Sequence, residues 1–173
     1  MKGRQEWGKY TPEGSEKGIA YIEQAIKKDP GHAASYAALG DCCWAALHGL
    51  MAPIAVFAEA RAAATRALEL DETLAEAHAP LGAVTYMFDW DFRGAERGFK
   101  RAVELNPSSA SARAQYGVYL AFMGRFDEGI ARFEAIATTD KAGSLLAPGK
   151  DLAFDAFLAE VYVESGRPVE VQR

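Results

Sequence analysis

Residues 66–82 read RALELDETLAEAHAPLG and residues 101–117 read RAVELNPSSASARAQYG, so one pattern occurs twice at a spacing of 35 residues, from Arg66 to Arg101. A third copy, residues 24–40, reads QAIKKDPGHAASYAALG. Each copy joins a charged amphipathic segment to an alanine-rich one through a short stretch of turn-forming residues. Such self-similarity is the signature of a repeat architecture, so the repeat has to be defined before any residue is given a chemical role.

Apolar residues around these copies recur three and four positions apart, as in the series Ala95, Phe99, Ala102 and Val103. This spacing is typical of amphipathic helices, and no sustained alternation favours strands. The sequence therefore predicts an all-α fold. The expected helices cover residues 12–28, 33–47, 54–70, 74–88, 92–105, 109–123, 126–137 and 151–165.

The order of residues in each unit resembles the tetratricopeptide-repeat (TPR) family, whose helix pairs carry W-x2-L-G-x2-Y in the first helix and A-x3-F, A and P in the second. The clearest unit matches at His78, Leu81, Gly82, Thr85, Ala95, Phe99, Ala102 and Pro107. The same register places Gly40, Gly82 and Gly117 where the two helices approach most closely. The resemblance implies a right-handed superhelix, or α-solenoid, of antiparallel helix pairs.

In this register residues 1–173 form a single array. Its parts are a partial repeat at 1–31, complete repeats at 32–73, 74–108 and 109–150 (the first with a long turn, the third with a long loop), and a partial repeat at 151–173. The long turns are similar to repeats in the C-terminal regions of bacterial signalling proteins such as winged-helix regulators and nucleotide cyclases. Partial repeats leave apolar faces uncovered, so we expect either continuation into a longer protein or a homodimer through the array ends.

Charge and composition narrow the function. The formal net charge is −5 and no basic block is present, which argues against a nucleic-acid partner. The adjacent Cys42 and Cys43 are poorly placed to bridge each other, which favours a reducing compartment. Neither a signal peptide nor an apolar stretch long enough for a membrane span is evident, so we expect a cytoplasmic location and no membrane partner.

No catalytic, metal or cofactor site is predicted. The segment GSLLAPGKD at 143–151 departs from a phosphate loop in its glycine spacing and in the residue after lysine. The three histidines lack metal-ligand spacing, and Asp89, Asp91 and Glu96 fit helix capping better than calcium binding. We therefore expect a protein that is not an enzyme.

Function in a helical array is expected on its concave face, which here means the first-helix positions that do not pack into the next unit. We predict a groove there for a protein or peptide partner, smooth along a column of alanines and flanked by apolar anchors and acids. The predicted lining residues are Asp41, Trp44, Glu76, Ala79, Ala83, Tyr86, Met87, Ala114, Val118, Phe122, Glu160 and Glu164.

Two alternatives stay open. The aromatic residues could simply complete the core, or Trp44, Tyr86, Met87 and Phe122 could close around an apolar small molecule, as in a sensor domain. Pro80 breaks a local rule because it stands inside an expected helix. It either adjusts the curvature between repeats or frees the Glu76 carbonyl to accept a hydrogen bond from a ligand.

Overall fold

The computed structural model describes residues 12–41, 53–139 and 159–166, and the regular structure in these ranges is entirely helical. The predicted all-α class is therefore confirmed. The chain divides into two compact units, residues 1–105 and 106–173, and each is described here by itself. Their boundary falls close to the predicted border between the second and third complete repeats. The single array over 1–173 stays a prediction.

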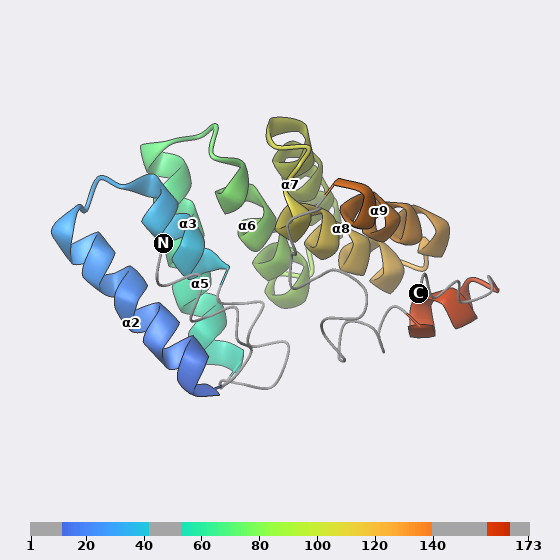
Figure 1. Cartoon of the computed structure of the whole chain (residues 1–173), viewed down its shortest axis with the longest axis horizontal. Helices are drawn as coiled ribbons and strands as arrows, with labels where there is room; N and C mark the ends of the chain where they lie inside the picture. The colour runs from blue at the N-terminus through green and yellow to red at the C-terminus, as the bar shows by residue number, and fades with distance from the viewer. Residues whose placement is uncertain (1–11, 42–52, 140–158, 167–173) are drawn as a thin grey trace. The chain divides into compact units, whose positions relative to one another are not determined.

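Figure 1 shows the helices of the first unit, which follow one another along the chain. They are α2 (Pro12–Lys28), α3 (Ala33–Gly40), α5 (Pro53–Leu70), α6 (Ala75–Phe88) and α7 (Phe92–Leu105). Helix α3 packs on α5, α6 packs on α7, and α5 also contacts α6, the first helix of the next pair. The bounds of α2, α5, α6 and α7 lie within one residue of the predicted ones. The helix predicted over 33–47 ends at Gly40, with Asp41 as its C-cap, and the remainder of that range lies outside the described residues.

Small residues let these helices approach closely. Ala37 of α3, Ala67 of α5 and Ala77 of α6 form one fully buried cluster, and larger side chains such as Tyr36 and Leu68 pack against it. A Cβ atom on Gly40 would lie 3.3 Å from the Cβ atoms of Ala64 and Pro80. The same atom on Gly82 would lie 3.2 Å from the carbonyl oxygen of Ala95. The predicted close-approach register is therefore confirmed in this unit.

Pro80 lies inside α6 and is buried. Its ring faces the position of Gly40 on α3, where a Cβ atom would come within 3.3 Å of the proline Cβ. The ring thus fills the space that a glycine leaves on the neighbouring helix. The contact gives Pro80 a packing role, whereas both alternatives offered from the sequence, a change of curvature and a ligand bond to the Glu76 carbonyl, stay predictions.

The joints between consecutive helix pairs share one hydrogen-bonded turn. The side-chain oxygens of Asp29, Asp71 and Asn106 accept from the backbone N–H two residues ahead, at 3.1, 2.9 and 3.2 Å. In each joint the backbone carbonyl of the same residue accepts from the N–H three residues ahead, at 3.1–3.2 Å. At each of the three described joints the turn follows the end of one helix and precedes the start of the next.

The second unit contains α8 (Ala110–Phe122), α9 (Phe126–Thr139) and a last helix at residues 159–164. The side chain of Ser109 caps α8 by accepting from the Ala112 N–H at 3.2 Å. Gly117 repeats the close approach, because a Cβ atom there would lie 2.7 Å from the Phe133 ring. The last helix packs on α8 and α9 through Val161 and Tyr162.

Candidate functional site

In the first unit, most predicted concave-face residues contribute to the core. Ala79, Ala83 and Tyr86 are buried, while Asp41, Glu76 and Met87 are half-buried. Met87 packs against the cluster of Phe57, Ala60 and Val84, so its side chain joins α6 to α5. Trp44 lies outside the described residues.

Tyr86 shows how burial limits the chemistry on this face. Its ring centroid lies 6.2 Å from that of Phe99, and burial raises the pKa of its phenol far above the usual value. The phenol therefore stays protonated at any physiological pH. A protonated, packed tyrosine serves as a core residue and as a hydrogen-bonding group, and it offers no reactive oxyanion.

The second unit leaves more of its predicted residues exposed. Ala114 and Val118 are buried, but the Phe122 side chain at the end of α8 is 62 % exposed. Glu160 and Glu164 of the last helix are exposed as well. Val163, between these two acids, is 68 % exposed. The end of α8 and the last helix therefore offer two large apolar side chains and two carboxylates to solvent.

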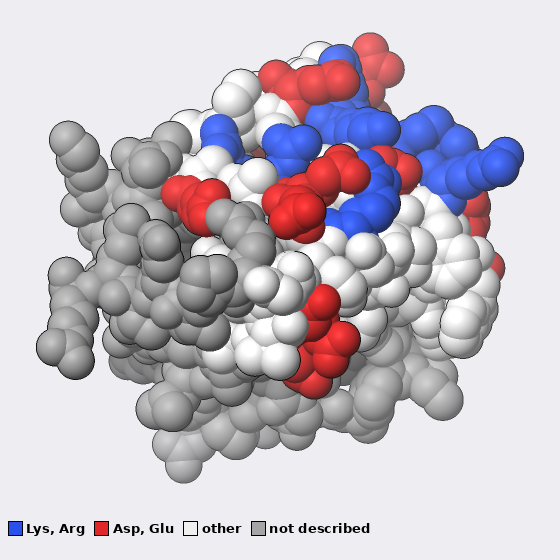
Figure 2. All heavy atoms as spheres, turned by 90° about the vertical axis from the view of Figure 1, so that its right-hand side faces the viewer, with Lys and Arg blue, Asp and Glu red and all other residues white. Residues whose placement is uncertain are grey.

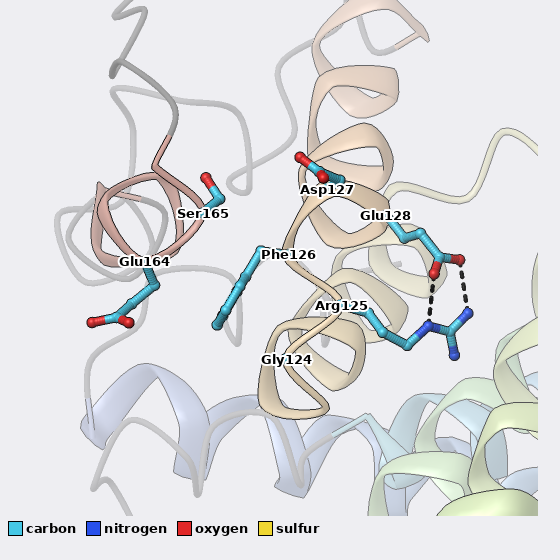
Figure 3. Close-up of a pocket in the computed structure, with 7 residues that line it drawn as sticks. All are labelled: Gly124, Arg125, Phe126, Asp127, Glu128, Glu164 and Ser165. Carbon is cyan, nitrogen blue, oxygen red and sulfur yellow. Dashed lines mark hydrogen bonds and ion pairs between the residues drawn. The ribbon is translucent and has the colours of Figure 1, made fainter.

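A pocket of about 380 Å³ lies beside the turn between α8 and α9 (Figure 3). The ring of Phe126 points from the start of α9 toward the side of the last helix that carries Glu164. Sequence reasoning singled out only Glu164 among its lining residues. The full lining is Gly124, Arg125, Phe126, Asp127, Glu128, Glu164 and Ser165.

The pocket has a negative bias, because its lining holds three acidic side chains and one basic side chain. The Arg125 guanidinium donates two hydrogen bonds to the Glu128 carboxylate, both at 2.7 Å, so these two charges offset each other. Figure 3 shows this pair pointing away from the Phe126 ring. The other two acids of the lining are Asp127 and Glu164. An aromatic ring beside carboxylates suits a cationic side chain of a partner.

Elsewhere the surface charges are mixed. On the face shown in Figure 2, acidic and basic side chains lie among one another along the upper part, with mostly uncharged side chains below. Ion pairs join neighbouring charges, for example Lys100 with Glu96 at 3.1 Å and Arg66 with Glu69 at 2.8 Å. A mixed surface favours local contacts over long-range attraction of one class of ligand.

The other candidates from the sequence serve structural roles where the structure describes them. Asp91 caps α7 by accepting from the Gly94 N–H, Asp89 pairs with Arg61, and Glu96 pairs with Lys100. Within the described ranges no group of three or more His, Cys, Asp or Glu residues could hold a metal ion. Cys42, Cys43 and the segment 143–151 lie outside the described residues.

Two histidines complete this group of structural contacts. His32 hydrogen-bonds to the hydroxyl of Ser35 at 2.8 Å, next to the start of α3. His78 hydrogen-bonds to the carbonyl of Glu72 at 2.9 Å, across the joint before α6. None of the helices in the described part of the chain is long and apolar enough to cross a membrane.

Comparison with curated proteins finds similarity to a transcriptional regulator. Over 131 residues the chain is 28 % identical to the transcriptional regulator HilA of Salmonella typhimurium strain LT2. The match covers 75 % of the chain but only 24 % of HilA, so the chain spans about a quarter of the length of the curated relatives that it matches. No protein-family model matches the chain.

Solved structures with a similar backbone are TPR proteins. TTC0263 of Thermus thermophilus aligns with a TM-score of 0.60 and 18 % identity over 84 % of the chain and 72 % of that protein. MamA aligns with a TM-score of 0.53 and 23 % identity over 94 % of the chain and 77 % of MamA. YrrB, described as a TPR protein with an unusual peptide-binding site, aligns with a TM-score of 0.50 and 24 % identity over 89 % of the chain and 71 % of YrrB. At these identities the likeness concerns the fold.

Proposed function

Because the chain has the tetratricopeptide-repeat fold, we propose that it is a non-enzymatic module that binds a peptide or helix of a partner protein. The observation that carries this proposal is the exposed edge of the second unit. There, Phe122 and Val163 are largely exposed although they stand on helices that pack in the core. Large exposed apolar side chains with a polar surround are typical of binding surfaces.

The proposed partner carries both an apolar and a basic residue. Phe122 supplies the apolar contact, and Glu164 together with Asp127 contributes to the negative bias of the nearby pocket. A Lys or Arg side chain entering the pocket would meet the Phe126 ring as well as the carboxylates. YrrB lends support, since it is described as having a peptide-binding site in a similar fold.

The wider setting of this module is also a proposal. The match to HilA covers a quarter of a transcriptional regulator, which supports a regulatory or scaffold role within a larger bacterial signalling protein. A cytoplasmic location would follow from that role. The homodimer through the array ends remains a proposal beside it, and analytical ultracentrifugation over a range of concentrations tests it.

Replacing Phe122 by alanine is expected to weaken peptide binding about tenfold or more, because large aromatic anchors dominate such interfaces. The probes are twelve-residue peptides selected from a random display library on the wild-type chain, and fluorescence anisotropy of the labelled peptides gives each Kd. We expect the selected peptides to combine Lys or Arg with an apolar residue, and Glu164→Lys to weaken them too.

Tyr21→Ala is the matched control, since Tyr21 is 45 % exposed on α2 of the other unit. Its variant should bind the peptides as the wild type does, and all variants should melt alike. Equal binding by the wild type and by Phe122→Ala would contradict the proposed surface. Selection of only acidic peptides would contradict the proposed partner chemistry.

A further inference from the structure

The turn between α6 and α7 holds an unusual residue. Trp90 has φ +58°, in the left-handed region, and its side chain is 74 % exposed. A residue with a Cβ atom costs about 1–2 kcal/mol in that conformation. Burial does not offset this cost at Trp90, although burial would be the usual reason to keep a tryptophan.

The equivalent turn in the second unit shows the unstrained solution. There the residue after the C-cap of α8 is Gly124, with φ +72°, and Gly166 likewise has φ +69° after the last helix. Trp90 stands directly after Asp89, the C-cap of α6, which is the same position. Glycine adopts this conformation without strain. Strain without a gain in packing is a reason to look for a functional role.

Hydrogen bonds hold the backbone of the turn that carries Trp90. The N–H groups of Asp89 and Asp91 both donate to the Thr85 carbonyl, at 3.2 and 3.3 Å, and Arg61 of α5 holds the Asp89 carboxylate through two hydrogen bonds of 2.7 Å. The indole ring meets the Phe92 ring edge-on, with their centroids 6.1 Å apart. The large exposed side chain is therefore anchored at its base.

The charged side chains around Trp90 carry a net positive charge. Asp89 is offset by Arg61, and Asp91 is engaged by the N–H of Gly94 at the start of α7. Arg93 and Arg97 are exposed, and within the described ranges neither has a hydrogen-bond or ion-pair partner. They lie one helical turn apart on the outer face of α7, and Arg93 is only three residues from Trp90.

We propose that Trp90, Arg93 and Arg97 form a second docking surface, which binds an acidic peptide segment that carries a large apolar residue. The indole is the apolar contact, and the two guanidinium groups each take a carboxylate. Two Arg residues one turn apart, about 5–6 Å between Cβ atoms, match acids two residues apart on an extended peptide or four apart on a helix. This surface is independent of the Phe122 surface and takes a partner of the opposite charge.

The ion pair between Asp89 and Arg61 at the base of this surface can be tested by titration. The hydrogen bonds from Arg61 hold the pKa of the Asp89 carboxyl below its usual value of 3.8. The ion pair is therefore present at neutral pH and is lost as the pH falls through the lowered value. Carboxyl NMR titration should place the Asp89 midpoint below 3.8 in the wild type and near it in Arg61→Gln. Identical midpoints in both proteins would show that the pair does not form in solution.

The docking test uses peptides selected from a random twelve-residue library on the Phe122→Ala chain, so that it does not depend on the first proposed surface. We expect enrichment of peptides with several Asp or Glu residues and at least one aromatic or large aliphatic residue. Trp90→Ala and Arg93→Glu/Arg97→Glu should each weaken their binding about tenfold or more by anisotropy. The affinity should also fall as salt rises.

Matched controls separate docking from folding. Tyr21→Ala removes another exposed aromatic, and Lys27→Glu/Lys28→Glu reverses two exposed cations on α2. Both control variants should bind as the starting protein does. Trp90→Asn, which tolerates the left-handed backbone, should melt within a few degrees of the wild type yet lose the acidic peptides.

Three results would overturn the proposal: enriched peptides without acids, acidic peptides that bind the Trp90 and Arg variants unchanged, or no enrichment over a parallel selection on Trp90→Ala. Vesicles of phosphatidylcholine with phosphatidylserine and a single-stranded oligonucleotide are tested in parallel. Binding to either one that depends on Trp90, in the absence of peptide binding, would also overturn it and would reassign the surface.

Discussion

Phe99→Ala is expected to destabilise the first unit by about 3–5 kcal/mol, the usual cost of emptying a fully buried phenylalanine site. Phe99 is completely buried and belongs to α7. Its ring lies against the glycine position at 82 on α6 and 6.2 Å from the Tyr86 ring, so it packs α7 against α6. Few neighbours can move in to fill the gap, because both helices already touch at small residues.

Thermal and denaturant unfolding followed by circular dichroism measure this loss. Tyr21→Ala serves as the control, since it removes an aromatic ring that is 45 % exposed, and it should change stability by less than about 1 kcal/mol. A Phe99→Ala protein that unfolds at the same denaturant midpoint as this control would contradict the α6–α7 contact.

The second large effect is expected for Gly82→Leu, which should cost about 3 kcal/mol or more through overpacking. A Cβ atom alone would meet the Ala95 carbonyl oxygen at 3.2 Å and the Phe99 ring at 3.3 Å. The backbone carbonyl belongs to a helix and cannot move aside by itself. A leucine therefore has to push α6 and α7 apart.

Ala62→Leu is the matched control, because Ala62 is exposed on α5 and a leucine there meets solvent. The same unfolding measurements on both variants separate overpacking from a mere change of residue. Gly82→Ala should fall between the wild type and Gly82→Leu. If Gly82→Leu melted like Ala62→Leu, the close approach of the two helices would be wrong.

The sequence predicted the fold well because the fold rests on local, periodic features. Small residues recur at the helix contacts, and the register of the TPR resemblance located Gly40, Gly82 and Gly117. Turn-forming residues such as Asp71 and Asn106 marked the joints, since their side chains bond to nearby backbone. Both signals depend on a few neighbouring positions, which a single sequence records.

The candidate site was less predictable because it depends on how far each side chain is covered. Periodicity placed Ala83 and Phe122 on the same face, yet one is buried and the other is 62 % exposed. The pocket brings Phe126 and Ser165 together although they lie far apart in sequence, through packing of the last helix on α9. No local pattern reports such a contact.

Trp90 was missed for a different reason. The DWDF turn was interpreted as capping, which Asp91 confirms, but the backbone of Trp90 between the acids went unnoticed. A comparison of the chain with itself could have found it. The turn after α8 carries Gly124 at the corresponding place, so a bulky residue there signals a departure from the local rule.

The three described joints between helix pairs use the same turn, with an Asp or Asn side chain accepting from the N–H two residues ahead. A gene segment that encodes the residues after Asp71 up to Asn106 begins and ends within the same kind of turn. An additional copy inserted there would therefore have this turn at both of its new junctions. Unequal recombination within the gene would then yield longer or shorter proteins whose new junctions use the same hydrogen-bonded turn. Such joints make the number of repeats a quantity that evolution can change in single steps.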